Sequence, residues 1–145
     1  MAQEKFGQDR YLPEGDWAFA VEAAAVAGTK FRKNQAHDFA KAVKVAEQKG
    51  LEYGLELEPE PDNRADPNAI KVIGFAETAG WFGRVQFQEW HVGYIDKALA
   101  KTLQKEMLGK DVEIVAELQH VTVDGEKVGI EMSVLQPEEA EPTKQ

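Results

Sequence analysis

A proline-rich polar loop between two strand-like segments constrains the fold of this chain more than any other stretch. The loop lies within residues 57–73 and contains Pro59, Pro61 and Pro67. Proline fixes φ, lacks an amide donor and drives the preceding residue toward an extended conformation. The loop also holds two aspartates and two asparagines, Asp62, Asn63, Asp66 and Asn68. Because such side chains bond to nearby main chain, we expect a rigid loop that holds polar groups in fixed directions.

Alternating apolar and polar residues predict strands on both sides of this loop and at four other places. The six expected strands lie at residues 17–27, 53–58, 69–73, 84–95, 112–118 and 128–134. The alanine run within the first of these segments would equally suit a helix. Residues 74–83 are glycine-containing and are expected to be loose turn material. Asp124-Gly125 predicts a hairpin between the last two strands.

Apolar residues at helical spacing predict two helices, over residues 35–49 and 97–108. Asn34 and Asp96 stand where the N-terminal caps of these helices would be. Short strands at close spacing, together with two helices, favour a β-rich α+β fold. The expected architecture is a small, partly open β-barrel of the OB or SH3 kind.

The length of 145 residues suits a single domain. Residues 1–16 are polar and are expected to be a flexible N-terminal lead-in, followed by the folded domain at residues 17–135. Residues 136–145 are acidic and are expected to form a disordered tail.

The net charge of −9 argues against sequence-blind binding to duplex phosphates. The charge is uneven, however, because residues 28–44 hold five cations and one anion. Residues 51–66 hold six anions and one cation. A local cationic face therefore stays open as an interpretation, beside that of an ordinary solvated helix surface.

The sequence offers no positive sign of catalysis or of a bound cofactor. The three histidines, His37, His91 and His120, have no ligand spacing, and cysteine is absent. The only serine, Ser133, falls within an expected strand, and no phosphate loop or metalloprotease motif occurs. The acidic residues 56–66 lack the spacing of a calcium loop, so a solvated strand edge is the better interpretation. We expect no enzyme activity, no cofactor and no metal.

The N-terminus lacks the apolar core of a signal peptide, and no apolar run approaches the ~20 residues of a membrane helix. Together with the absence of cysteine, this favours a soluble cytoplasmic protein.

Three motifs in order resemble those of the HIRAN domain. They are Ala27-Gly28-Thr29-Lys30-Phe31, the D-N-R-A-D-P-N-A-I-K-V run at residues 62–72, and Val92-Gly93-Tyr94-Ile95 with a helix behind it. The likeness covers roughly residues 17–135. It implies an OB-like barrel, of a kind found fused to fork-remodelling translocases and other DNA-processing enzymes. Such domains also occur alone in bacteria and phages, which is the type this chain resembles.

The best-understood HIRAN domain binds the 3′-hydroxyl end of single-stranded DNA. The resemblance implies six DNA-binding residues here: Lys30, Phe31, Asn63, Asp66, Tyr94 and Lys97. Phe31 would stack on a terminal base, and Lys30 and Lys97 would lie near phosphates. Asn63 and Asp66 would face the terminal nucleotide, with Asp66 accepting the 3′-hydroxyl. Tyr94 matches a histidine that lines the family's site.

One position departs from the family pattern. The DNA-binding member has a second stacking aromatic residue two positions after the asparagine, where this chain has Ala65. Phe82, Phe87 or Trp90 could supply that wall of the pocket. Other site residues have a structural alternative. Asp66 could lock the loop instead of binding, and Phe31 could be part of the core. Tyr94 could be a barrel residue, and Lys97 could belong to an ordinary helix surface.

The sequence favours a non-catalytic module that recognises single-stranded DNA or its 3′-hydroxyl end in repair or replication. The alternative is a protein-interaction module, an acidic accessory or inhibitor of a DNA-processing enzyme that keeps the fold without binding DNA. In that case the partner would be the DNA-processing enzyme. A metal-dependent hydrolase ranks last.

Overall fold

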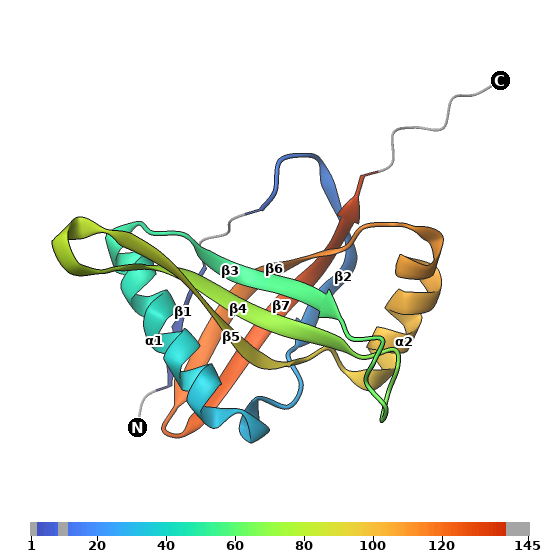
Figure 1. The fold of residues 1–145 in the computed structure, drawn as a ribbon, viewed down its shortest axis with the longest axis horizontal. Helices are drawn as coiled ribbons and strands as arrows, with labels where there is room; N and C mark the ends of the chain where they lie inside the picture. The colour runs from blue at the N-terminus through green and yellow to red at the C-terminus, as the bar shows by residue number, and fades with distance from the viewer. Residues whose placement is uncertain (1–2, 9–11, 139–145) are drawn as a thin grey trace.

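The computed structural model describes residues 3–8 and 12–138, which form two antiparallel sheets and two helices (Figure 1). One sheet has the order β1-β6-β7-β2, and its strands span Glu4–Phe6, Val115–Asp124, Lys127–Pro137 and Trp17–Ala25. The other has the order β3-β4-β5, with strands Tyr53–Pro59, Ile70–Ala79 and Val85–Tyr94. The helices are α1 (Lys33–Lys49) and α2 (Lys97–Glu106), with short 3₁₀ helices η1 (Thr29–Phe31), η2 (Trp81–Gly83) and η3 (Leu108–Lys110). The predicted β-rich α+β fold is confirmed, and neither sheet closes into a barrel within these residues.

Most of the expected elements are present at shifted boundaries. The alanine run lies in β2 and is not helical, because residues 17–25 pair with β7. Residues 74–79, expected to be turn material, instead continue β4. They do so because β4 is the central strand, with Ala76 paired to Tyr53 on one side and to Gln88 on the other.

The helix starts were predicted with mixed success. Asp96 caps α2 as expected, since its carboxylate accepts a hydrogen bond from the Leu99 amide at 3.4 Å. Asn34 does not cap α1. That helix starts at Lys33, two residues before the expected start at residue 35, and its N-cap residue is Arg32.

The N-terminal segment is not entirely a loose lead-in. Residues 4–6 form β1, which pairs with residues 121–123 of β6. This strand forms because Phe6 packs on the core while Lys44 ion-pairs with Glu4 and lies over the Phe6 ring. At the other end β7 reaches Pro137, two residues beyond the expected domain boundary, and the rest of the expected tail, residues 139–145, lies outside the described residues.

Helix α1 covers one face of the β3-β4-β5 sheet through Phe39. The Phe39 ring lies directly on the backbone of Gly74, where an added Cβ would come within 2.5 Å of the ring. The same ring is 6.1 Å from the ring of Trp90, centroid to centroid. The lack of a side chain at Gly74 therefore allows the helix to pack closely on the sheet. No helix among the described residues has the length and apolar character needed to cross a membrane.

The two sheets are joined where β5 ends beside the segment that follows β2. Ala27 and Tyr94 exchange two backbone hydrogen bonds, of 2.8 and 2.9 Å, and the Val26 amide donates to the Ile130 carbonyl of β7. Gly93 makes this approach possible, since an added Cβ would lie 2.3 Å from the Ala27 carbonyl oxygen. The segment at residues 26–27 thus links the edge of one sheet to the other.

The β4–β5 hairpin extends beyond α1 and ends in exposed aromatic residues (Figure 1). Trp81 is 86% exposed, and Phe82 is fully exposed with a positive φ of 59°. Figure 1 places this tip and α2 on opposite sides of the molecule.

We predict that Gly93→Ala destabilises the fold by about 1–3 kcal/mol, the usual cost of forcing an extra carbon into a packed site. The new methyl group would press on the Ala27 carbonyl and break the exchange of hydrogen bonds with Tyr94. Urea unfolding followed by circular dichroism measures the change. Gln86→Ala, at an exposed position of the same strand, should change stability by less than about 0.5 kcal/mol. A Gly93→Ala protein as stable as the wild type would contradict the prediction.

Candidate nucleic-acid interface

The loop that joins β3 to β4 is held rigid by its own polar side chains. The Asn63 side-chain oxygen accepts hydrogen bonds from the amides of Ala65 and Asp66, each at 3.0 Å. One Asp66 carboxylate oxygen accepts from the Asn68 amide at 3.0 Å. The Glu60 amide donates to the Ala69 carbonyl and closes the base of the loop at 2.9 Å.

This geometry refines the expected role of Asp66. The carboxylate does lock the loop, and only through Oδ1, so that Oδ2 makes no hydrogen bond with the described residues. The lock and an exposed acceptor therefore coexist in one side chain. Asn68 takes part in the lock as a backbone donor, and not through its side chain.

Glu60 links the loop to the neighbouring strands, although the sequence interpretation had counted it only as part of an acidic surface. Its Oε1 accepts from the Tyr94 hydroxyl at 3.0 Å and from the Asn63 side-chain amide at 2.7 Å. Its Oε2 pairs with Lys71 Nζ at 3.2 Å. The hydrogen bond from Asn63 is the main cause that lowers the pKa of Glu60 below its ordinary value of 4.5, and Lys71 and Tyr94 add to it.

Tyr94 lies between this carboxylate and a cluster of basic groups. The Arg32 guanidinium carbon lies 5.9 Å from the centre of the Tyr94 ring, and the His91 ring contacts the ring edge-on, with centroids 4.9 Å apart. Burial raises the pKa of Tyr94. Burial, and then the charge of Arg32, lower the pKa of His91 and so favour its neutral form. Arg32 was also missed by the sequence interpretation, because it stands outside the motif that ends at Phe31.

Four of the six expected site residues line one pocket. Asn63, Asp66, Tyr94 and Lys97 line a volume of about 320 Å³, and Ala27 and Gly28 are also part of its lining. A second hollow of about 620 Å³ shares Ala65, Asp66 and Lys97 with this pocket and continues along α2 to Lys101. We call the two adjoining hollows the groove; its charged lining residues are Asp66 of the loop, Asp96 at the N-cap of α2, and Lys97 and Lys101 of the helix.

The other two expected residues, Lys30 and Phe31, lie at the rim of this pocket and do not line it. The Phe31 amide donates to the carbonyl of Gly28, which is itself a lining residue, at 3.0 Å. The Phe31 side chain is 81% exposed, and Lys30 Nζ lies 5.1 Å from the centre of its ring. Phe31 is therefore an exposed platform beside the pocket and not a core residue.

The missing aromatic wall at Ala65 is not replaced. Phe87 stacks on Phe75 with ring centroids 5.2 Å apart, and Trp90 packs on Phe39 under α1. Phe82 lies at the hairpin tip, at the end of β4 and β5 that is remote from the pocket. None of the three rings that could have supplied this wall lines the pocket, because Phe82 lies in η2 at the hairpin tip and the other two rings pack on Phe75 and Phe39.

The other chemistry that the sequence raised has a structural explanation. The Ser133 hydroxyl is buried, donates to the Glu22 carbonyl and accepts from the side-chain amide of Gln119. Within residues 3–8 and 12–138, no group of three or more histidine, aspartate and glutamate side chains is placed to hold a metal ion.

A family model, that of the HIRAN domain, matches residues 23–135. The match includes all six expected site residues, both helices, the whole of strands β3 to β6 and parts of β2 and β7. Comparison with curated proteins and with solved structures gave no match.

We predict that Glu60→Gln destabilises the protein at pH 7 and that the difference from wild type shrinks as the pH falls below about 4.5. The substitution keeps an oxygen acceptor for Asn63 and Tyr94 but removes the charge. A carboxylate whose pKa is lowered in the folded state stabilises it above the unfolded pKa, and that contribution is lost as the pH falls through the folded pKa. Urea unfolding at pH 7, 5 and 3 measures the effect. Glu113→Gln, on an exposed residue, is the control, and a difference that stays constant with pH would contradict the assignment.

Proposed function

The chain belongs to the HIRAN domain family, and we propose on this ground that it is a non-catalytic module that binds single-stranded DNA at its 3′-hydroxyl end. The observation that carries the proposal is the convergence of Asp66 and Lys97 on one pocket. Neither the Asp66 Oδ2 atom nor the Lys97 ammonium group has a partner within the described residues. A free acceptor beside a free cation suits a hydroxyl next to a phosphate.

Asp66 would provide the preference for an end over a continuous strand. Its free Oδ2 would accept a hydrogen bond from a terminal hydroxyl, and the same charge would repel a phosphate at that position. Because Oδ1 is held by the Asn68 amide, the carboxylate is already oriented before DNA arrives. Little side-chain entropy would then be lost on binding.

Lys97 and Lys101 would hold the phosphates that precede the terminal nucleotide. They stand one helical turn apart on α2 and both face the groove. The cations in this region are few, and the whole chain carries a charge of −9. Binding would therefore depend on local groups of cations such as this pair and would weaken as salt increases.

Phe31 would stack on a base next to the pocket. Its ring is exposed, and its backbone amide donates to the carbonyl of Gly28, which lines the pocket. Stacking on an aromatic ring is tolerant of base identity, because every base has a π face. The module would accordingly recognise an end without reading a sequence, which suits a protein that acts on DNA ends during repair or replication.

A protein-interaction module that keeps the fold without binding DNA is the second candidate. Ala65 leaves one side of the pocket without an aromatic ring. The protein also has an acidic surface at Glu56: burial raises the pKa of this residue most, and the neighbouring charges of Glu89 and Glu58 raise it further. The exposed Trp81 and Phe82 add an apolar surface at the far end of the molecule. An acidic surface and an apolar tip would suit docking on a DNA-processing enzyme.

We predict that the wild-type protein binds an oligonucleotide with a 3′-hydroxyl at least about tenfold more tightly than one with a 3′-phosphate, and that Asp66→Asn lowers this ratio to about threefold or less. Asparagine keeps the oxygen that holds the Asn68 amide but loses the charge. Fluorescence anisotropy with 5′-labelled oligothymidylate measures both affinities.

Asp62→Asn, on an exposed residue of the same loop that does not line the pocket, is the matched control and should keep the wild-type ratio. Equal binding of the two wild-type ligands would refute end recognition. The absence of any binding would favour the protein-interaction module.

We predict that Phe31→Ala weakens binding of single-stranded DNA by about 1–3 kcal/mol, which is roughly 5- to 150-fold in Kd. The reason is the loss of the stacking platform at the rim of the pocket. Trp81→Ala removes an equally exposed aromatic ring at the remote hairpin tip and should leave Kd unchanged. If the two variants lose the same affinity, stacking at Phe31 is not the cause.

A further inference from the structure

We propose that a second cavity, lined by Lys30, Lys33 and Lys127, binds the phosphodiester backbone of the strand whose 3′ end occupies the pocket at Asp66. This inference rests on the proposed function and extends it. The site would recognise phosphate charge along single-stranded DNA, at a place that the family motifs at residues 27–31, 62–72 and 92–95 reach only through Thr29 and Lys30.

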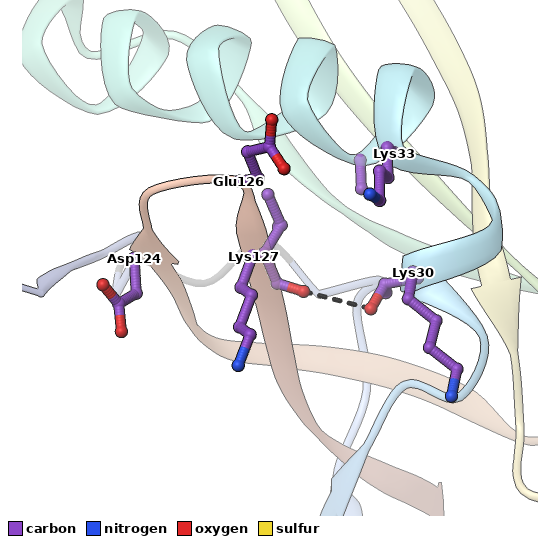
Figure 2. Close-up of a pocket in the computed structure, with 8 residues that line it drawn as sticks. Lys30, Lys33, Asp124, Glu126 and Lys127 are labelled. Carbon is purple, nitrogen blue, oxygen red and sulfur yellow. Dashed lines mark hydrogen bonds between the residues drawn. The ribbon is translucent and has the colours of Figure 1, made fainter.

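The cavity lies between η1, the start of α1 and the turn that joins β6 to β7. It has a volume of about 620 Å³, and its lining residues are Thr29, Lys30, Lys33, Ala36, Asp124, Glu126, Lys127 and Val128. The Thr29 hydroxyl donates to the Val128 carbonyl at 3.0 Å and fixes η1 against β7 (Figure 2). The walls are thus tied together by a contact between segments far apart in the chain.

The three lysines are solvent-exposed, and none forms an ion pair with the part of the chain that the structure describes. Figure 2 shows Lys30 and Lys127 extending to the same side of the cavity. The Glu126 carboxylate is directed the other way, toward α1, and Asp124 lies on the far side of Lys127 from Lys30. Lys30 and Lys127 are therefore grouped on one side with neither acidic side chain of the lining between them, whereas Lys33 lies beside α1, on the side to which Glu126 is directed.

The linings of the cavity and the first pocket meet at the start of η1. Gly28 lines the first pocket, and the next two residues, Thr29 and Lys30, line the cavity. Phe31 stands on the same element with its ring exposed. In Figure 1 the β3–β4 loop, η1 and the β6–β7 turn follow one edge of the molecule. A strand that leaves the pocket past Phe31 would reach the lysines directly.

Lysine suits this role better than it would suit recognition of a base. Its ammonium group is a compact point charge on a flexible stem, so it contacts phosphates without demanding one geometry. The cavity would add affinity in proportion to the number of phosphates that it neutralises, and each such contact would add to the salt dependence. The effect should appear only with strands long enough to span both sites.

The test compares the double variant Lys33→Gln/Lys127→Gln with the wild type on 3′-hydroxyl oligothymidylates of about 4 and about 16 nucleotides, the limits of single-stranded site sizes for related folds. We expect the affinity for the longer ligand to fall about tenfold. The slope of log K against log salt should fall by about 1.4, since each single-strand phosphate contact contributes about 0.7. The affinity for the shorter ligand should stay within about twofold.

Lys49→Gln/Lys105→Gln removes the same charge from the far ends of α1 and α2 and is the matched control, expected to leave both affinities unchanged. The inference is overturned if the two double variants behave alike on the longer ligand, or if the shorter ligand loses as much affinity as the longer one. It is also overturned if the wild type binds neither ligand.

End recognition and the lysine cavity can fail separately. A length-dependent loss in the double variant without any preference for a 3′-hydroxyl would support the cavity and refute recognition of the end. A preference for a 3′-hydroxyl without a length-dependent loss of affinity in the double variant would support recognition of the end and refute the cavity.

Discussion

The exchange of backbone hydrogen bonds between Ala27 and Tyr94 is the contact on which the rest of the site depends. It brings the end of one sheet against a segment that is itself bonded to the other sheet. The Tyr94 hydroxyl is thereby placed within hydrogen-bonding distance of Glu60, and Gly28 becomes part of the lining of the pocket. The approach is only possible because Gly93 has no side chain. The absence of a side chain at Gly93 therefore determines where both η1 and the β3–β4 loop can lie.

Carboxylates serve two purposes in this acidic protein. The Glu60 carboxylate accepts hydrogen bonds from Asn63 and Tyr94 and pairs with Lys71, and these contacts hold the loop in place. Asp66 is only half satisfied, which leaves an acceptor facing the pocket. The difference lies in local geometry, because both residues belong to the same acidic run. Net charge alone is for this reason a poor guide to what the groove can bind.

The sequence predicted local features well and long-range partners poorly. The strand at residues 17–25 and the cap at Asp96 depend on neighbours in the chain, and both are present, although Phe19 of that strand is exposed. The prolongation of β4 through residues 74–79 depends on pairing with two other strands, which no local pattern reveals. The family motifs placed four residues in one pocket, since motif spacing is tied to fold. Glu60 was missed because its partner Tyr94 is 34 residues away.

The β4–β5 hairpin is long, and its length is independent of the geometry of the pocket. Beyond Glu77 the hairpin has no third strand beside it, and residues 81–89 are exposed. The register at the pocket is set from the other end, where Lys71 pairs with Tyr94. Residues could be gained or lost in pairs at the tip without changing which side chains face the groove. Evolution could thus vary the reach and the chemistry of this arm freely, while the pocket keeps its form.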